Sequence, residues 1–304
     1  MIVLNSLFPI FVLVVLGSVL KRFDLTSDAY LKTSDKLVYY IFFPVLLFWK
    51  IGGASYSSAI DWRFCFAVLL ALLMMFVIST IVINLGSISR FKAGSFSQCC
   101  YRFNTYIGVA VILNSLGEEG VASFGVLIAI VIPLINVFAV SVLIWFSGEE
   151  VALSKRVRAA LRALVANPLI IGCLTGLVYG RLVGYFPVFV DNSLHLMSMV
   201  TLPLALLSVG GSLSFKGLQR HLPLSLLAAL LKLVVLPISG FVIFKSFEVT
   251  GISFKVGMIF FCLPASTSIY VLSSQLNSDT ELAASAIVVS TILSFISLSI
   301  ALLL

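Results

Sequence analysis

The sequence predicts an all-α polytopic membrane protein with ten transmembrane helices, arranged as a 5+5 inverted repeat. Three observations lead to this fold class. Of the 304 residues, 61% are hydrophobic and only 10% are charged, which leaves too little charge to coat a soluble domain. Apolar stretches long enough to cross a hydrocarbon core of ~30 Å recur along the chain. Prolines and glycines also return at one constant spacing in the two halves.

Windows with few charges locate most of the expected spans. A helix rises ~1.5 Å per residue, so about 20 apolar residues cross the hydrocarbon core. Windows 93–117 and 221–244 each contain a single cation, Arg102 and Lys232 respectively. The windows that contain no charged residue are 1–20, 64–89, 120–148, 163–180, 256–278 and 282–304.

The remaining two spans carry weaker signals. Window 192–215 is interrupted only by His195. The second span has a charge-free part at 37–49, and we extend it back to about Lys32, past Asp35, so that the charges reach the membrane interface. All ten spans are expected to be helices, because lipid offers no hydrogen-bond partner to an open strand edge.

Residues that recur 159 positions apart indicate two copies of one unit. Five spans per copy is an odd number, so the second copy enters the membrane from the opposite side, as in many secondary transporters. We expect the first inverted repeat at 1–147, a cytoplasmic amphipathic linker at 148–166 and the second repeat at 167–304. The recurring residues are Pro9, Gly17, Arg22, Pro44 and Gly52, which return as Pro168, Gly176, Arg181, Pro203 and Gly211.

The distribution of cations predicts the orientation. With the N-terminus outside, cytoplasmic connections hold 12 of the 19 Lys and Arg residues and external connections hold 5. The positive-inside rule therefore places both termini outside, in a bacterial inner membrane. The net charge of +7 is then a topology signal and does not indicate nucleic-acid binding. The five cysteines lie in apolar spans without a CxxC pair, so we expect no metal and no cofactor.

Polar residues interrupt the fourth and ninth spans at matching positions. Asn104 and Thr105, with Gly108, interrupt the fourth span, and Asn104 shifted by 159 falls beside Pro264 in the ninth. Proline removes a backbone donor, and Asn, Ser and Thr compete for backbone hydrogen bonds. A broken helix at this depth must line a cavity or be buried in protein. We therefore expect a transport site here, completed by Ser266 and Thr267.

These segments resemble the auxin efflux carrier family, which includes plant auxin exporters and bacterial malate-permease-like proteins. The resemblance covers nearly the whole chain and includes an R-x-N-T-x-x-G run at Arg102–Gly108. It implies crossing of the broken fourth and ninth helices, a scaffold of spans 1, 2, 6 and 7, organic anions as cargo, and a homodimer. Val109 stands where the family often has proline. The other similar segments are LFPIFVLVVLGSVLKR, KLVYYIFFPVLLF, LLKLVVLP and LPASTSIYVLSSQL.

The broken helices suggest how an anion is bound. Each second half-helix begins near the midplane with a partial positive charge and free N–H groups, which favour a carboxylate. The hydroxyls and the amide at the breaks add hydrogen-bond donors. The alternative is that these side chains only cap the interrupted helices.

Three charged residues stand out near the expected site. Lys232 lies deepest in a span, and we expect it to offset the negative ends of the first half-helices or to take part in coupling. Arg102 either snorkels to the interface or guards the inner mouth of the pathway. Asp35 is the one carboxylate near a span, toward the cytoplasmic end.

The leading functional prediction is a secondary transporter of small organic anions, malate-like or auxin-like acids, that exports them by alternating access. The alternative is a passive anion channel or a membrane sensor without coupled transport. An enzyme is not expected, because the spans hold neither an HExxH motif nor a pair of buried acids. The expected partners are the anion, the lipid bilayer and a second copy of the chain.

Overall fold

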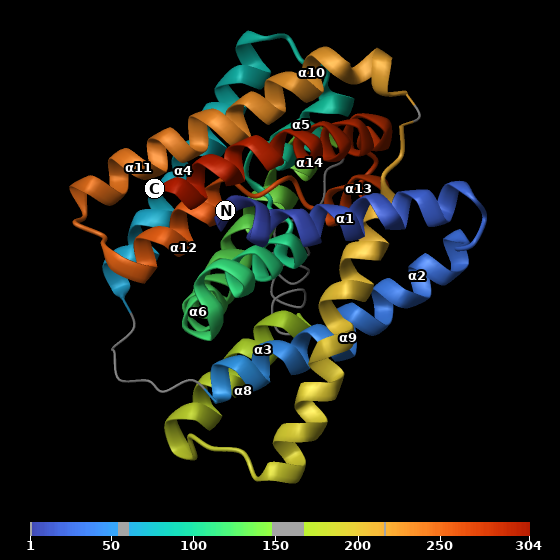
Figure 1. Cartoon of the computed structure of the whole chain (residues 1–304). Coiled ribbons are helices and arrows are strands. Elements are labelled where there is room, and N and C mark those ends of the chain that lie inside the picture. The colour runs from blue at the N-terminus through green and yellow to red at the C-terminus, as the bar shows by residue number, and fades with distance from the viewer. Residues whose placement is uncertain (1, 54–60, 148–166, 216) are drawn as a thin grey trace. The chain divides into compact units, whose positions relative to one another are not determined.

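The computed structural model is all-helical over the residues that it describes, which are 2–53, 61–147, 167–215 and 217–304 (Figure 1). The expected linker at 148–166 lies outside these residues. The helices are α1 (Ile2–Arg22), α2 (Asp28–Leu37), η1 (Val38–Phe42), α3 (Phe43–Gly52), α4 (Trp62–Leu85), α5 (Arg90–Tyr101), α6 (Thr105–Ser147), α8 (Pro168–Leu182), α9 (Val188–Ser212), α10 (Leu218–Leu230), η2 (Leu231–Val235), α11 (Leu236–Ser246), α12 (Gly251–Phe261), α13 (Ser268–Gln275) and α14 (Thr280–Leu303).

The described helices include six stretches that are long and apolar enough to cross a membrane, and two shorter apolar helices. One of the six, Arg90–Leu143, is 54 residues long and contains the fourth expected span and most of the fifth. Within α6, Gly117 has φ 68° and ψ −157°, which ends one helix and begins another. The ten spans therefore stay a prediction.

The chain forms two compact units, and each unit takes segments from both halves of the sequence. Unit 1 contains 1–61, 109–132 and 163–212, and so holds α1, α3, α8 and α9. Unit 2 contains the rest of the chain, including α4, α5 and α10 to α14. The bounds of these two units therefore do not coincide with the expected repeats at 1–147 and 167–304.

Unit 1 is built on close contacts between backbones. Figure 1 shows α1 running across α9, and α3 beside α8. A Cβ atom added to Gly17 would lie 2.1 Å from the carbonyl oxygen of Leu207, and one added to Gly210 would lie 1.8 Å from that of Val14. Glycine is required at both positions because any side chain would separate α1 from α9.

The contacts of unit 1 repeat with the spacing seen in the sequence. Gly17 approaches the backbone of Leu207, and Gly176 approaches the backbone of Phe48, where a Cβ would lie 3.1 Å from the oxygen. Both members of the second contact are 159 positions from a member of the first. An internal two-fold repeat would produce this pairing of α1 with α9 and of α8 with α3.

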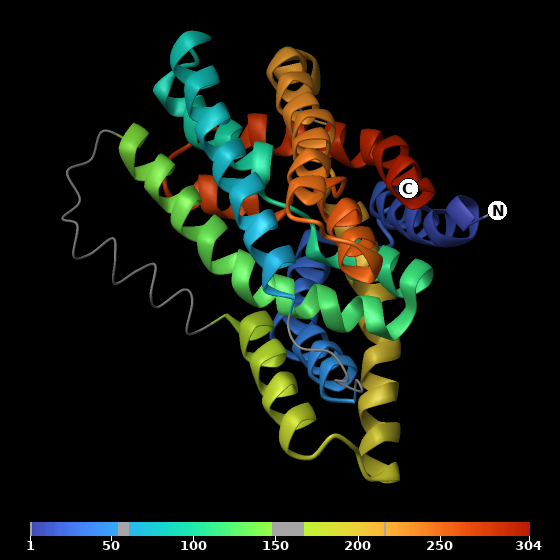
Figure 2. The same ribbon diagram turned by 90° about the vertical axis from the view of Figure 1, so that its left-hand side faces the viewer.

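Unit 2 surrounds two interrupted helices. In this unit α11 packs against α4, and α10 packs against α14 (Figure 2). Helices α5 and α13 also contact each other and α14. The first half of the fourth expected span and the second half of the ninth are therefore neighbours.

Two prolines explain the two π-helical segments. Pro44 follows η1 by two residues and Pro237 follows η2 by two residues. Proline has no N–H and its ring clashes with the carbonyl four residues earlier, so an α-helical bond is lost there. The preceding turns widen instead, and the N–H of Leu236 donates to the oxygen of Leu231. Lys232 lies in one of these widened turns.

We predict that Gly210→Ala destabilises the protein by about 1–3 kcal/mol, because the added methyl group overpacks the contact between α1 and α9. Thermal unfolding in detergent checks this. Gly53→Ala is the matched control, since its Cβ would meet no atom closer than 3.3 Å. Equal melting temperatures for the two variants would contradict the close-packing account.

Candidate functional site

The first break separates α5 from α6. Helix α5 ends at Tyr101, and Arg102 is extended with φ −71° and ψ 144°. The chain regains helical geometry only at Thr105. Residues 102–104, called the first break below, thus interrupt the fourth expected span where Asn104 predicted an interruption.

Asn104 caps the helix that begins after the first break. Its Oδ1 atom accepts hydrogen bonds from the N–H groups of Tyr106 and Ile107, both at 3.1 Å. Its carbonyl oxygen accepts from the N–H of Gly108 at 3.0 Å. The side-chain Nδ2 of Asn104 is buried and has no hydrogen-bond partner among the described residues. Asn104 therefore caps the helix and keeps a donor available.

The second break, residues 262–267, separates α12 from α13. Its backbone is held by serines of α14: Ser290 Oγ accepts from the N–H of Ala265 at 3.1 Å, and Ser297 Oγ donates to the oxygen of Cys262 at 3.0 Å. Ser266 Oγ accepts from the N–H of Ser268 at 3.4 Å, at the start of α13. These bonds satisfy polar backbone groups that the interrupted helix cannot pair.

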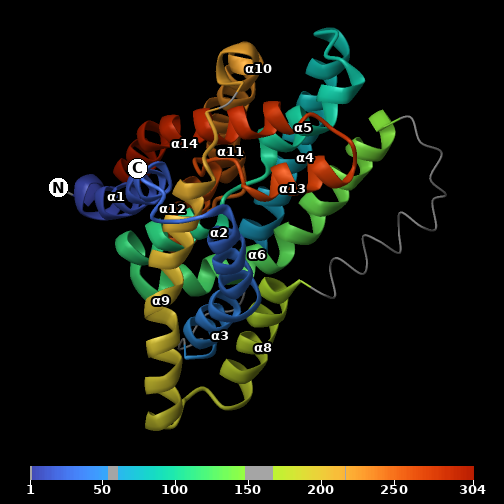
Figure 3. The ribbon, with the colours of Figure 1, turned by 90° about the vertical axis from the view of Figure 1, so that its right-hand side faces the viewer.

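A backbone hydrogen bond joins the two breaks. The N–H of Asn104 donates to the carbonyl oxygen of Pro264 at 2.9 Å. The rings of Phe103 and Phe260 meet edge to face beside this bond, with centroids 4.6 Å apart. Figure 3 shows α12 and α13 as separate helices on either side of the second break. The positions that were expected to match in the repeat are thus in contact.

The expected site residues differ in exposure. Asn104, Gly108 and Pro264 are buried, whereas Thr105, Ser266 and Thr267 are partly exposed. The hydroxyls of Ser266 and Ser268 are 2.8 Å apart. Partly exposed hydroxyl groups therefore lie at the N-termini of α6 and α13, whereas Asn104 is buried.

Lys232 is fully buried beside the first half-helices. Its ammonium group has no hydrogen-bond partner among the described residues. The side chain interacts electrostatically with Cys100, in the last turn of α5, and with Cys262, which follows α12. Its Nζ lies 5.7 Å from the centre of the Phe260 ring. Lys232 thus lies near the two helix C-termini, as expected from the sequence.

Arg102 is held inside unit 2. Its guanidinium donates to Gln98 Oε1 at 3.2 Å and to Asn136 Oδ1 at 3.1 Å, and its relative exposure is 9%. These contacts do not fit the expectation that Arg102 snorkels to the interface, because two amide side chains bind its head group and one of them, Gln98, is buried. The sequence did not single out Gln98, although its spacing of four residues from Arg102 on α5 is a signal for this contact.

Asp35 lies in unit 1, on α2, where its carboxylate interacts with the hydroxyl of Ser208. The residues around the breaks belong to unit 2, so a role of Asp35 in coupling stays a prediction. Within the described part of the chain, no group of three or more His, Cys, Asp or Glu side chains is arranged to hold a metal ion.

Comparisons with known proteins agree with this architecture. A family model described as "Membrane transport protein" matches residues 2–302. The chain is also similar to an uncharacterized transporter of Methanocaldococcus jannaschii, with 27% identity over 308 residues. The similarity covers 99% of this chain and 98% of that transporter.

We predict that Asn104→Ala lowers the free energy of unfolding by about 1–2 kcal/mol, because two N–H groups at the start of α6 lose their acceptor. Asn104→Ser should retain most of the stability, since serine is also a strong N-cap. Unfolding of both variants in detergent gives the comparison. An alanine variant as stable as the wild type would show that Asn104 does not cap α6.

Proposed function

Since this chain belongs to the membrane transport protein family, the family of the auxin efflux carriers, we propose that it moves small organic anions by alternating access. The protein is an integral membrane transporter, and the resemblance found in its sequence is confirmed by the family match. The observation that carries the finer proposal is the buried, unpaired amide donor of Asn104, which lies at the N-terminus of α6 in a break that is hydrogen-bonded to the second break.

The proposed anion site has two sources of positive potential. The N-termini of α6 and α13 each contribute about half an elementary charge, and both begin at a break. Asn104 Nδ2 and the hydroxyls of Ser266 and Thr267 are hydrogen-bond donors for carboxylate oxygens. Because Asn104 Oδ1 is already used for capping, the unpaired Nδ2 is the part of this side chain that remains to bind a ligand. This set of groups favours a carboxylate over a cation or a neutral solute.

Lys232 compensates the opposite ends of the broken helices in this proposal. A cation near the bilayer centre costs about 2.5–3.5 kcal/mol on insertion scales. The C-termini of α5 and α12 carry partial negative charge, and Lys232 lies beside the residues that end both helices. The charge therefore stabilises the interrupted helices and adds to the positive potential of unit 2.

The transport cycle that we propose moves unit 2, which carries both breaks, while unit 1 is the scaffold. The contacts repeated at 159 positions in unit 1 support an internal repeat, and we propose that the repeat is inverted with ten spans and both termini outside. We further propose a homodimer in a bacterial inner membrane. Export of an anion would gain ~2.3 kcal/mol per charge per 100 mV of membrane potential, which provides a driving force without a coupling ion.

Reconstituted liposomes test the function directly. The purified protein should take up labelled malate or an aromatic monocarboxylate with saturation, and unlabelled substrate inside should accelerate this uptake. Such exchange is expected of a carrier and not of a passive channel. Fluxes equal to those of empty liposomes for every carboxylate in the panel would contradict the proposal.

We predict that Asn104→Asp weakens carboxylate binding by at least about tenfold, or ~1.4 kcal/mol, while the capping oxygen is retained. The new carboxylate removes a donor and repels the anion. Ser266→Ala should weaken binding by a smaller factor. Ser246→Ala serves as the matched control, since that hydroxyl donates to the carbonyl oxygen of Val242 on its own helix. Unchanged dissociation constants in both break variants would contradict the site.

We predict that Lys232→Met reduces the maximal transport rate by about tenfold or more, because the negative ends of α5 and α12 lose their compensating charge. Methionine fills a similar volume, so the variant should still fold, although the loss of the stabilising charge should lower its melting temperature. Liposome flux and thermal unfolding are measured together. Wild-type flux in a stably folded Lys232→Met variant would remove this residue from the mechanism.

A further inference from the structure

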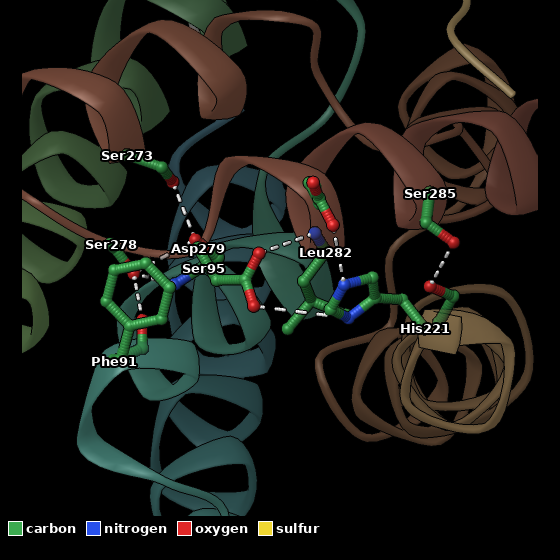
Figure 4. Close-up of polar contacts among 10 residues, drawn as sticks. Phe91, Ser95, His221, Ser273, Ser278, Asp279, Leu282 and Ser285 are labelled. Atoms are coloured by element: carbon green, nitrogen blue, oxygen red, sulfur yellow. Dashed lines mark hydrogen bonds and ion pairs between the residues drawn. The ribbon is translucent and has the colours of Figure 1, made fainter. Parts of the chain in front are cut away.

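A buried histidine lies between two carboxylates, away from the breaks but in the same unit. His221, in the first turn of α10, is 3% exposed (Figure 4). Its Nε2 is 3.3 Å from Glu281 Oε2, and its Nδ1 is 4.0 Å from Asp279 Oδ2. The Asp279 side chain is also buried, with 8% exposure, whereas that of Glu281 is 61% exposed. The contact with Asp279 is therefore the one that solvent screens least.

Asp279 is fixed by contacts other than the one with His221. Its Oδ1 accepts from the N–H of Leu282 at 2.9 Å and caps α14, while its own N–H donates to the oxygen of Phe91 on α5 at 3.0 Å. Only Oδ2 faces the imidazole. At 4.0 Å this is an ion-pair distance, and Nδ1 has no hydrogen-bond partner among the described groups.

The turn that carries Asp279 also ties α13 to α5. Ser278 Oγ donates to the oxygen of Phe91 at 2.8 Å and lies 3.0 Å from Ser95 Oγ. Ser95 Oγ in turn donates to Ser273 Oγ at 2.9 Å (Figure 4). We call Ser95, Ser273 and Ser278 the serine clamp. The clamp joins the half-helix that ends at the first break to the half-helix that begins at the second.

The charged side chains near His221 belong to α10 itself and to the elements that pack against it. Helix α14 contributes Glu281, and the preceding turn contributes Asp279. Arg220 is adjacent on α10 itself. Among the described residues, the two carboxylates are the ion-pair partners of the imidazole. The other ionisable side chains on the packed elements are Arg90, Lys92, Cys99, Cys100 and Tyr101 of α5, and Lys232 of η2.

We propose that His221 is a pH-responsive positioning residue that tightens the serine clamp when it is protonated. An imidazolium donates from both nitrogens and so bonds both carboxylates, whereas a neutral imidazole has one donor and turns a lone pair toward the other carboxylate. Protonation therefore draws Asp279 toward α10 and holds the turn at 278–279 against α5. Deprotonation releases it.

The effect on transport rests on the proposed function. The clamp fixes the C-terminal end of α13, whose N-terminal end carries the hydroxyl groups of the anion site. A tightened clamp orders the site and restrains its movement. Acidification on the side of the membrane where the N-terminus of α10 lies should therefore lower both the KM for the anion and the maximal rate.

The first experiment needs no substrate. Amide hydrogen exchange of the full-length protein is followed at Ser278, Asp279 and Leu282 from pH 5.5 to 8, and each variant is compared with the wild type at the same pH. At low pH, amide protection in the wild type should exceed that in His221→Gln by about threefold or more. This factor corresponds to an ion pair of ~0.6 kcal/mol. At high pH the difference in protection should vanish. His195→Gln is the matched control and should match the wild type throughout.

Asp279→Asn is the second variant, because it keeps the capping oxygen of α14 and removes the charge that faces His221. It should lose the pH-dependent protection in the same way. For each variant, the ratio of wild-type to variant protection is compared across the pH range. If this ratio is the same at every pH for both variants, the proposal is overturned.

Transport measured over the same pH range completes the test. His221→Gln should abolish the parallel fall of KM and maximal rate at low pH, with His195→Gln unaffected. If the clamp responds to pH in the exchange experiment but no carboxylate is transported, the proposed function is rejected and the pH response of the serine clamp is retained. If transport occurs with a pH profile that His221→Gln leaves unchanged, the role of His221 in transport is rejected.

Discussion

The fold of unit 2 depends on one constraint, which is that polar backbone groups inside the membrane must find partners within the protein. Two helices of this unit are interrupted, and every interruption leaves N–H and C=O groups unpaired. The bond from Asn104 to the oxygen of Pro264 pairs one break with the other. Asn104 Oδ1, Ser290 and Ser297 pair much of the remaining backbone. These polar side chains lie in apolar spans because they supply hydrogen bonds to the interrupted backbone.

The constraint also connects structure to function. A pair of breaks needs capping groups, and the same groups and helix termini produce a positive potential suited to an anion. Lys232 lies beside the residues that end α5 and α12, and Ser290 of α14 accepts a hydrogen bond from the backbone of the second break. The serine clamp and His221 lie toward the C-terminal end of α13, so this half-helix links the proposed anion site to the residue that we propose to respond to pH.

Much of this arrangement could be predicted from the sequence. Apolar windows located the helices because burial in lipid demands them, and the shared spacing of 159 residues placed the break at Asn104 opposite Pro264. The sequence could not show that Gln98 and Asn136 hold Arg102, because a contact between distant helices depends on packing. The widened turn at Lys232 follows from Pro237, but its burial depends on α5 and α14. Asp35 was singled out as the one carboxylate near a span, and its position in unit 1 depends on packing that the sequence does not show.

The central claim is that a carboxylate binds at the paired breaks, and the most direct measurement is the position of a heavy atom on a bound anion. Crystals of the protein soaked with bromosuccinate would be recorded at the bromine absorption edge. The account predicts an anomalous peak beside Asn104 and Ser266 that is lost in Asn104→Asp. A reproducible peak elsewhere in the protein, with none at the breaks, would contradict it.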